Sequence, residues 1–219
     1  MDISISQIKP AFPSPLNPSQ EAEAPAIQSI INALNLQPHP EGGYFSETDR
    51  DPHRVPNPYQ QSGTSESDTD KTRSASSTIH YLITPQRPLG VFHRNKSRTV
   101  HVWQGGRGRY VIIHADEIEG SDSIQEGAEK AKARIETFIV GPRVELGERV
   151  QWIVEGGKYK SSFLLPDEPD GEKSSGLLIS EVVVPGFEFA DHDFLPRKKM
   201  EDLLTAEQVQ ELDWMLRTE

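Results

Sequence analysis

The feature that most constrains this chain is a series of short β-type runs between residues 76 and 185, separated by glycine or proline. The runs cover residues 78–84, 91–93, 99–103, 109–115, 133–140, 149–154, 161–165 and 177–184. Many short strands with frequent turn residues are typical of a β-sandwich or a barrel. No helical pattern lies between the runs, which argues against a parallel α/β fold.

The segments on either side of this middle follow other patterns. Residues 1–22 are rich in Pro, Ser and Asn and predict a flexible or loosely packed arm. Between residues 23 and 36, apolar residues at helical spacing predict one helix that ends near Asn35, because Pro38 and Pro40 cannot continue it.

Two further segments are predicted from composition. Residues 51–74 are polar and predict a mobile loop insertion, which is either a plain insertion or a lid. Residues 196–219 predict one or two short helices, with Thr205 as an N-cap and Gln208 as its capping-box partner. The domain proper is therefore expected to span residues 23–195.

Size and charge exclude several classes of function. A chain of 219 residues suits one domain, and a net charge of −11 argues against a general nucleic-acid surface. The absence of cysteine excludes disulfides, thiolate zinc sites and a cysteine nucleophile. No signal peptide and no apolar run of roughly 20 residues is visible, so we expect a cytoplasmic protein without membrane partners.

Four segments carry a family resemblance. They are His39-Pro-Glu-Gly-Gly-Tyr-Phe, Phe92-His93-Arg94, Ile153-Val154 with Gly156-Gly157, and Val184-Pro-Gly-Phe-Glu-Phe189. In this order they resemble a family of small, largely uncharacterised cupins over roughly residues 24 to 195. The resemblance implies an all-β jelly roll with peripheral helices, a double-stranded β-helix that forms a homodimer and binds a small molecule inside the barrel.

The chain departs from the family pattern in two places. Thr99, His101 and Val102 stand where the family has an acidic residue, a Trp and a His, and Tyr159 and Lys160 stand where it has Trp and Gln. Related cupins bind a divalent metal through histidines and a carboxylate, whereas sugar epimerases of this fold work without one. The departures argue against a standard metal site, and no cofactor is predicted.

His93, His101 and Tyr159 are the predicted catalytic residues. A neutral imidazole serves as a general base or a metal ligand, although a histidine hydrogen-bonded at a strand end is the plain alternative for His93. Because strand residues alternate, Thr99, His101 and Trp103 share one face. We expect that face to point into the barrel, and the opposite phase would make His101 a surface residue.

Two kinds of chemistry stay open. Metal-free acid–base catalysis would use His93 or His101 as the base and Tyr159 or Tyr81 as the proton donor. A metal site would instead take His93 and His101 as two ligands, with His80 or His114 as a third.

Other side chains are candidates for holding the ligand. An arginine holds an anionic group well, and the candidates are Arg94, Arg98, Arg107 and Arg109. The complete predicted ligand-binding set is Glu41, Tyr81, Arg94, Thr99, Trp103, Arg109 and Lys160. The predicted function is a metal-independent isomerase, epimerase, cyclase or lyase acting on a small polar or anionic molecule. The alternatives are a non-catalytic binding protein and a metal-dependent oxygenase.

Overall fold

The strand-rich middle of the chain forms as expected. The computed structural model describes residues 3–13, 22–59, 71–118 and 131–218. Each of the eight β-type runs becomes a strand. These strands are β5 (Ser77–Ile83), β6 (Leu89–Asn95), β7 (Arg98–Gly105), β8 (Gly108–Ile113), β9 (Ile135–Val140), β10 (Gln151–Val154), β11 (Tyr159–Leu164) and β12 (Leu177–Val184).

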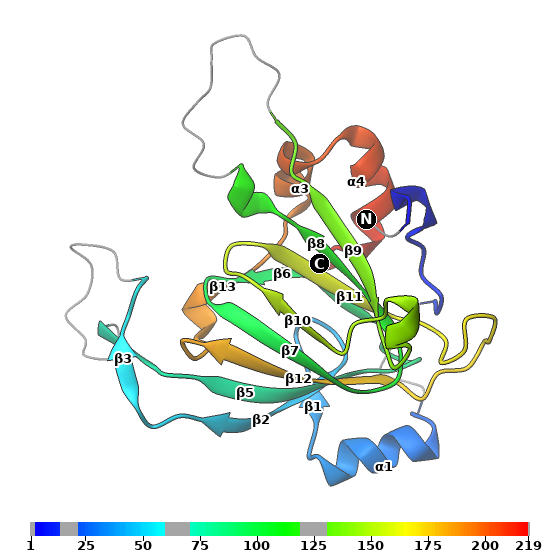
Figure 1. Ribbon diagram of the computed structural model, residues 1–219, viewed down its shortest axis with the longest axis horizontal. Helices are drawn as coiled ribbons and strands as arrows, with labels where there is room; N and C mark the ends of the chain where they lie inside the picture. Colours follow the sequence, from blue (N-terminus) through cyan, green and yellow to red (C-terminus); the bar gives the residue numbers. More distant parts are fainter. Residues whose placement is uncertain (1–2, 14–21, 60–70, 119–130, 219) are drawn as a thin grey trace.

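Together with β1 (Gln37–Pro38), β2 (Tyr44–Arg50) and β13 (His192–Phe194), these strands form two antiparallel sheets that face each other (Figure 1). The larger sheet has the order β1-β2-β5-β12-β7-β10, and the smaller sheet has the order β13-β6-β11-β8-β9. Neighbours such as β5 and β12 are far apart in the sequence, as the crossovers of a jelly roll require. The expected all-β jelly roll with peripheral helices is confirmed.

The barrel core lies between the two sheets. It is made of buried side chains from both of them, namely Tyr81, Ile83, Tyr110, Ile112, Phe138, Val140, Trp152, Val154, Leu164, Leu177 and Ile179. Directly paired residues on neighbouring strands point to the same face. His101 pairs with Trp152 and Lys160 pairs with Ile112, so both polar side chains point into the barrel.

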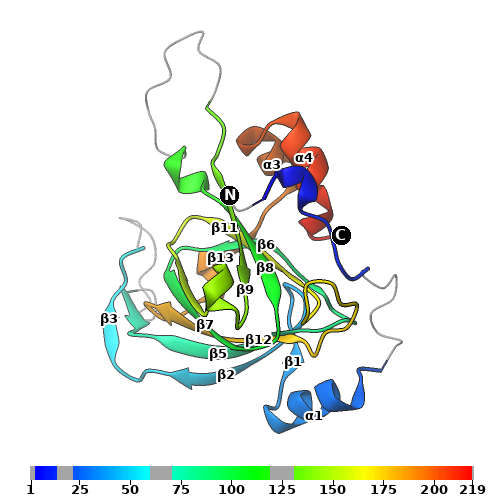
Figure 2. The same cartoon turned by 45° about the vertical axis from the view of Figure 1, so that its right-hand side comes forward.

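The C-terminal helices cover the outer face of the smaller sheet (Figure 2). They are α3 (Arg197–Leu203) and α4 (Ala206–Leu212), and the capping box at the start of α4 is confirmed: Thr205 Oγ1 accepts from the Gln208 N–H at 3.3 Å, and Gln208 Oε1 accepts from the Thr205 N–H at 2.9 Å. Their apolar side chains pack on Phe92, Val111 and Phe163. The helices thus bury the side of the smaller sheet that does not face the barrel.

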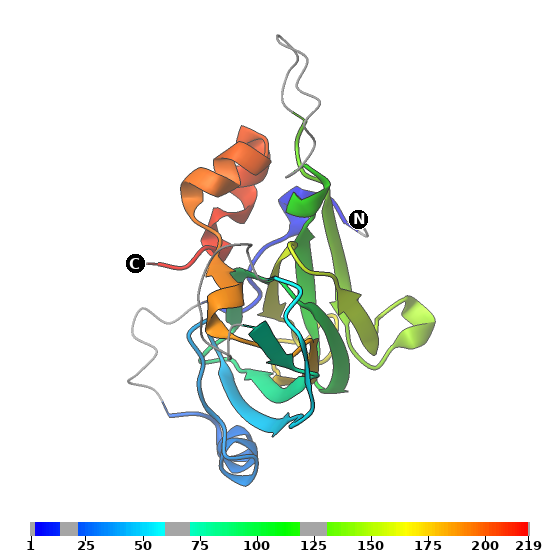
Figure 3. The same cartoon turned by 90° about the vertical axis from the view of Figure 1, so that its left-hand side faces the viewer.

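The described part of the N-terminal segment contacts the rest of the domain. A short 3-10 helix, η1 (Ile5–Gln7), lies beside α4 (Figure 2). Figure 3 shows that it lies at the end of the molecule that carries α3 and α4, opposite the N-terminal helix. Ile8, which was expected in a flexible or loosely packed arm, is completely buried in the same cluster as α3 and α4. Burying an isoleucine side chain stabilises a fold by roughly 1.5–3 kcal/mol, so Ile8 attaches this segment to the domain, although most residues around it are exposed.

The predicted N-terminal helix is also present. It is α1 (Pro25–Ala33), and it packs Ile27 and Ile31 against Leu82 on the outer face of the larger sheet. Asn35, just after it, has a φ of 52°, which ends the helix. In the described parts of the chain, helices are too short or too polar to cross a membrane.

The segment 51–74 is partly ordered. Its ends form a two-stranded ladder of β3 (Arg54–Pro56) and β4 (Thr72–Ser74). The Asp51 N–H donates to the Ser76 carbonyl at 3.0 Å, which ties this ladder to the sheet. The tip, residues 60–70, is outside the described residues, and the lid remains a prediction.

Candidate functional site

A tight turn between β1 and β2 places the first functional carboxylate. Gly42 and Gly43 have φ values of 106° and 65°, a region that glycine enters without strain. A Cβ on Gly42 would lie 2.0 Å from the carbonyl oxygen of Leu89, so the turn presses directly on β6. The Val91 N–H donates to the Glu41 carbonyl at 2.8 Å, which joins the turn to the barrel wall.

The Glu41 side chain lies among three histidines. Its Oε1 is 2.7 Å from Nε2 of His192, and its Oε2 is 3.2 Å from Nε2 of His93 and 3.6 Å from Nδ1 of His39. The Glu41 side chain is 13% exposed and that of His93 is 7% exposed. This group is therefore nearly dry, so its charges interact strongly.

The hydrogen bonds of His93 determine where its proton is. Nδ1 lies 2.8 Å from the carbonyl oxygen of Val91, and a carbonyl only accepts, so Nδ1 carries the hydrogen. In the neutral imidazole, Nε2 then presents a lone pair toward Glu41. No donor among the described residues hydrogen-bonds to that buried Nε2.

Electrostatics keep both groups unprotonated at neutral pH. Burial lowers the pKa of His93 to about 4, although Glu41 beside it acts in the opposite direction. For Glu41, burial alone would raise the pKa. The nearby imidazole of His93 and the hydrogen bond from His192 outweigh it and hold the pKa well below its usual value. The result is a pair of buried acceptors, 3.2 Å apart, that face each other.

A second polar group lies deeper in the barrel and is centred on Lys160. Its Nζ is 2.9 Å from Nε2 of His101 and 2.9 Å from Oε2 of Glu181. The side chains are 4%, 0% and 10% exposed for Lys160, His101 and Glu181. An ammonium only donates, so Nε2 of His101 accepts from it and the imidazole carries its hydrogen on Nδ1.

Aromatic rings hold His101 in place. Its ring stacks on Trp152 at 5.1 Å between centroids and meets Tyr110 edge-on at 5.5 Å. Burial, and after it the charge of Lys160, keeps the pKa of His101 well below its usual value. His101 is thus a neutral hydrogen-bond acceptor at physiological pH.

Six of the residues predicted from the sequence lie inside the barrel or in the turn that closes it. They are His93, His101, Glu41, Tyr81, Thr99 and Lys160. The strand phase that points His101 inward is the one that the structure has. Trp103 packs at the edge of the barrel core, and its Nε1 donates to the Gly106 carbonyl at 2.8 Å.

Tyr159, Arg94 and Arg109 lie outside the barrel, away from the other predicted site residues. Tyr159 pairs with Ile113, and both belong to the cluster under the C-terminal helices, so Tyr159 points away from the barrel. Arg94 lies over the Tyr159 ring at 4.6 Å and pairs with Asp193, and Arg109 lies on the outer side with Phe163. The physical reason is strand alternation: neighbours of inward-facing residues face outward.

Arg98 and Arg107 lie elsewhere too. Arg98 pairs at 3.4 Å with Glu155, and both side chains are about half exposed. Arg107 donates to Glu148 at 2.6 Å. Neither arginine joins the polar groups inside the barrel.

Tyr81 is inside but is committed to structure. Its hydroxyl donates to the Gly42 carbonyl at 3.0 Å and so braces the turn that carries Glu41. Burial raises the pKa of Tyr81 well above its ordinary value. This hydroxyl is a hydrogen-bond donor to the backbone rather than a ready source of protons.

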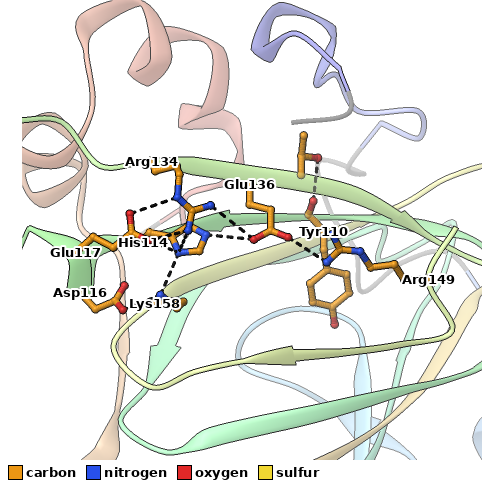
Figure 4. A network of polar contacts seen from close by, with 9 residues as sticks. Tyr110, His114, Asp116, Glu117, Arg134, Glu136, Arg149 and Lys158 are labelled. Atoms are coloured by element: carbon orange, nitrogen blue, oxygen red, sulfur yellow. Dashed lines mark hydrogen bonds and ion pairs between the residues drawn. The ribbon is translucent and has the colours of Figure 1, made fainter. Parts of the chain in front are cut away.

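The two other candidate metal ligands lie away from His93 and His101. His80 contacts Ser180 on the outer face of the larger sheet, at 3.3 Å. His114 belongs to a cluster at the end of β8 and β9, which we call the rim group: His114, Asp116, Glu117, Arg134, Glu136, Arg149 and Lys158 (Figure 4). Its Nδ1 lies 2.8 Å from Arg134 and 3.0 Å from Lys158.

The side chains in the barrel do not fit a divalent metal. The lone pair of His101 that a metal would use already accepts from Lys160, and an ammonium beside it repels a second cation. Among the residues described, no group of three or more His, Cys, Asp or Glu side chains is placed to hold a metal ion.

Three members of the two polar groups were not singled out from the sequence. Glu181 lies on the same face of β12 as the buried Leu177, Ile179 and Val183, so strand alternation could have found it. His39 lies within the first signature segment. His192 had no signal, because only the pairing of β13 with β6 brings it beside His93, with the rings stacked at 5.5 Å.

Two cavities border the Glu41 group. One of about 420 Å³ is lined by His39, Glu41 and residues near the C-terminus such as Trp214. Another of about 350 Å³ is lined by His192 and Asp193 among others. Volumes of 300–1,000 Å³ are typical of small-molecule sites, and each cavity has a member of this group in its lining: His39 and Glu41 in the first, and His192 in the second.

Comparison with known proteins agrees with this architecture. An uncharacterized protein of Saccharomyces cerevisiae, YML079W, is 40% identical over 191 residues, covering 87% of this chain and 86% of the yeast protein. A hypothetical protein from Leishmania major has a similar solved structure, with a TM-score of 0.67 and 28% identity, covering 87% of this chain and 98% of that one. Protein SO0799 from Shewanella oneidensis shares the fold at a TM-score of 0.63 and 18% identity, covering 91% of this chain and 100% of that one.

The family itself is also matched directly. Residues 28–195 fit the family model described as Cupin superfamily (DUF985). This span covers most of the chain and includes all four segments that carry the resemblance, so the resemblance seen in the sequence is confirmed. The protein belongs to the DUF985 family of the cupin superfamily.

Proposed function

We propose that this protein binds a small, neutral, hydroxyl-bearing molecule and transfers a proton on it, with Glu41 and His93 as the acid–base pair. The observation that carries the proposal is the pair of acceptors, Glu41 Oε2 and His93 Nε2, 3.2 Å apart with no donor between them. Such a pair accepts an O–H from a ligand or takes up a proton, and the carboxylate stabilises the imidazolium that forms.

The charges near the pair favour a neutral ligand over an anionic one. Two carboxylates, Glu41 and Glu181, face one ammonium, Lys160. Arg94 and Arg109, which were expected to hold an anionic group, lie outside the barrel. A carboxylate or phosphate on the ligand would therefore add negative charge to a site that already has an excess of it.

The reaction class follows from the groups that are present. One proton is taken up at His93 Nε2 and returned from the same pair, so substrate and product have the same oxidation state and no second reactant enters. Isomerisation and epimerisation meet this condition. We place a lyase or cyclase second, since either needs a group to protonate a leaving oxygen, and the Tyr81 hydroxyl is bound to Gly42.

The test is a hydrogen-exchange assay that does not require the product to be known. Neutral aldoses, ketoses and other hydroxyketones are incubated with untagged protein in D₂O, and the loss of individual C–H signals is followed by proton NMR. We expect exchange at one carbon of at least one neutral compound, in the presence of a chelator, and little exchange with the matching sugar acids and sugar phosphates.

Two variants make the assay specific. His93→Gln removes the base and should abolish exchange, whereas Arg94→Gln alters the outer side of the same strand and should leave it intact. Exchange that is equal in wild type and His93→Gln would contradict the role of His93. Saturable thermal stabilisation by a compound that shows no exchange would indicate the alternative, a non-catalytic binding protein.

A further inference from the structure

Lys160 occupies an unusual position for a lysine. Its side chain is 4% exposed, on β11 between the two sheets, and its Nζ reaches across the barrel to His101 on β7 and Glu181 on β12. Lysine is almost never buried unless it is paired. Here it is paired with one imidazole nitrogen and one carboxylate oxygen, each 2.9 Å away.

These two partners are the ligand types that a divalent metal binds in proteins. A metal-ligating histidine offers an unprotonated nitrogen, and a carboxylate offers an oxygen, both directed at one cation. His101 Nε2 and Glu181 Oε2 do this, 3.5 Å from each other, but the cation they face is the ammonium of Lys160. His93, the cross-strand partner of Lys160 on β6, brings a further imidazole to the same wall of the barrel.

We propose that Lys160 is a built-in cation that takes the place of a divalent metal between His101 and Glu181, so that removing its ammonium turns the barrel interior into a metal site. The inference rests on the geometry around Lys160 alone. It goes beyond the proposed function, because it applies equally to an enzyme and to a binding protein.

The inference predicts a gain of binding, which is a demanding test. Untagged wild type and the Lys160→Ala variant are titrated with Co²⁺, whose visible absorption reports nitrogen and oxygen ligands. We expect no Co²⁺ band in the wild type and one Co²⁺ per chain in Lys160→Ala. The band should be lost in the double variants that combine Lys160→Ala with His101→Ala or with Glu181→Ala.

Lys158→Ala is the matched control. It removes a lysine two residues away that also donates to a histidine, His114, but in the rim group. We expect this variant to take up no more Co²⁺ than the wild type. Uptake by Lys158→Ala equal to that of Lys160→Ala would mean that loss of any lysine near a histidine suffices, and the inference would be wrong.

A measurement on the wild type keeps the inference testable if Lys160→Ala fails to fold. Long-range nitrogen–proton NMR of the imidazole rings reports which nitrogen of His101 carries the hydrogen. We expect the Nδ1–H tautomer, unchanged by added Co²⁺, because Nε2 accepts from Lys160. An Nε2–H tautomer, or a His101 signal broadened by stoichiometric Co²⁺ in the wild type, would overturn the proposal.

Discussion

Two lysines, two residues apart in the sequence, make the same contact in different surroundings. Lys158 Nζ lies 3.0 Å from His114 Nδ1 in the rim group, and Lys160 Nζ lies 2.9 Å from His101 Nε2 inside the barrel. In the rim group, Arg134 donates to the same nitrogen at 2.8 Å, and Lys158 also pairs with Asp116. Without Lys158, His114 therefore keeps a hydrogen-bond donor, Arg134, whereas without Lys160 both His101 and Glu181 lose the ammonium that they share.

Solvent access separates the two groups further. In the rim group, the side chains of Lys158 and its partner Asp116 are 14% and 36% exposed, and those of Arg134 and Glu117 beside them are 54% and 43% exposed, so water screens these charges more than those in the barrel. In the barrel, Lys160 and Glu181 are 4% and 10% exposed. An exposed ion pair contributes about 0–1 kcal/mol, whereas removing one partner of a buried pair costs about 3–5 kcal/mol. The two lysine–histidine contacts are thus of nearly equal length, but we expect them to contribute unequally to the stability of the fold.

The largest expected effect is on stability, from removing the Lys160 charge. Lys160→Met keeps much of the volume but leaves Glu181 buried without its cation, so we expect a loss of about 3–5 kcal/mol in the free energy of unfolding. Lys158→Met should cost less than about 1 kcal/mol, because Arg134 still donates to His114. Urea unfolding at pH 7 measures both variants.

A second substitution identifies the cause of that loss. In the double variant that combines Lys160→Met with Glu181→Gln, the uncompensated carboxylate is gone, so part of the stability should return. The losses in unfolding free energy from Glu181→Gln and from Lys160→Met could instead simply add in the double variant. The two side chains would then not interact, and the barrel ion pair would contribute no more to stability than the ion pairs of the rim group.

The sequence predicted those parts of the structure that depend on local patterns. Helical spacing before residue 36 and the Gly/Pro-punctuated runs after residue 76 are local patterns, and they predicted α1 and the eight central strands. The inward phase of His101 on β7 was also expected, but on the strength of the family resemblance, because alternation of Thr99 and His101 with valines allows either phase. Tyr159 and Lys160 are neighbours, and local sequence alone did not decide which of them faces inward.

The rest depends on contacts between distant segments. Glu41 meets His192 across 151 residues, and Lys160 meets His101 across 59 residues, so no local pattern connects them. The burial of Ile8 could not be predicted for the same reason, since its partners are the C-terminal helices. The homodimer implied by the family resemblance stays a prediction, which sedimentation at micromolar concentration can test.

A loss of unfolding free energy of intermediate size is expected when the pH is lowered. Burial lowers the pKa of His93 from 6.5 to about 4, so the native state resists a proton that the unfolded chain accepts. Stability from this group is complete above pH 6.5 and is lost as pH falls toward about 4. Between pH 7 and pH 5 the loss should be about 2 kcal/mol for His93 alone.

Variants of His93 and His114 show which of the two imidazoles causes this pH dependence of stability. Urea unfolding of His93→Gln at pH 7 and pH 5 should show about 2 kcal/mol less acid destabilisation than the wild type. The pKa of His114 is also lowered, by burial and then by Lys158 and Arg134, but two of its charged neighbours, Arg134 and Glu117, are 54% and 43% exposed. His114→Gln should therefore change the pH dependence less. Parallel curves for wild type and His93→Gln would show that His93 is protonated in the native state at pH 5.

The smallest expected effect is that of salt on the stability losses of the Lys158 and Lys160 variants. It is also the most direct test of the difference between the rim group and the barrel, because only the solvent is changed. Raising NaCl from 0.1 M to 1 M shortens the screening length from about 10 Å to about 3 Å. The cost of Lys158→Met, already below about 1 kcal/mol, should then approach zero, while the cost of Lys160→Met relative to wild type should stay the same. Comparing each variant with wild type at the same salt cancels the general effect of salt on folding. If the cost of Lys160→Met also collapses, salt ions or water reach the barrel pair, and Lys160 cannot act as an internal cation shielded from solvent.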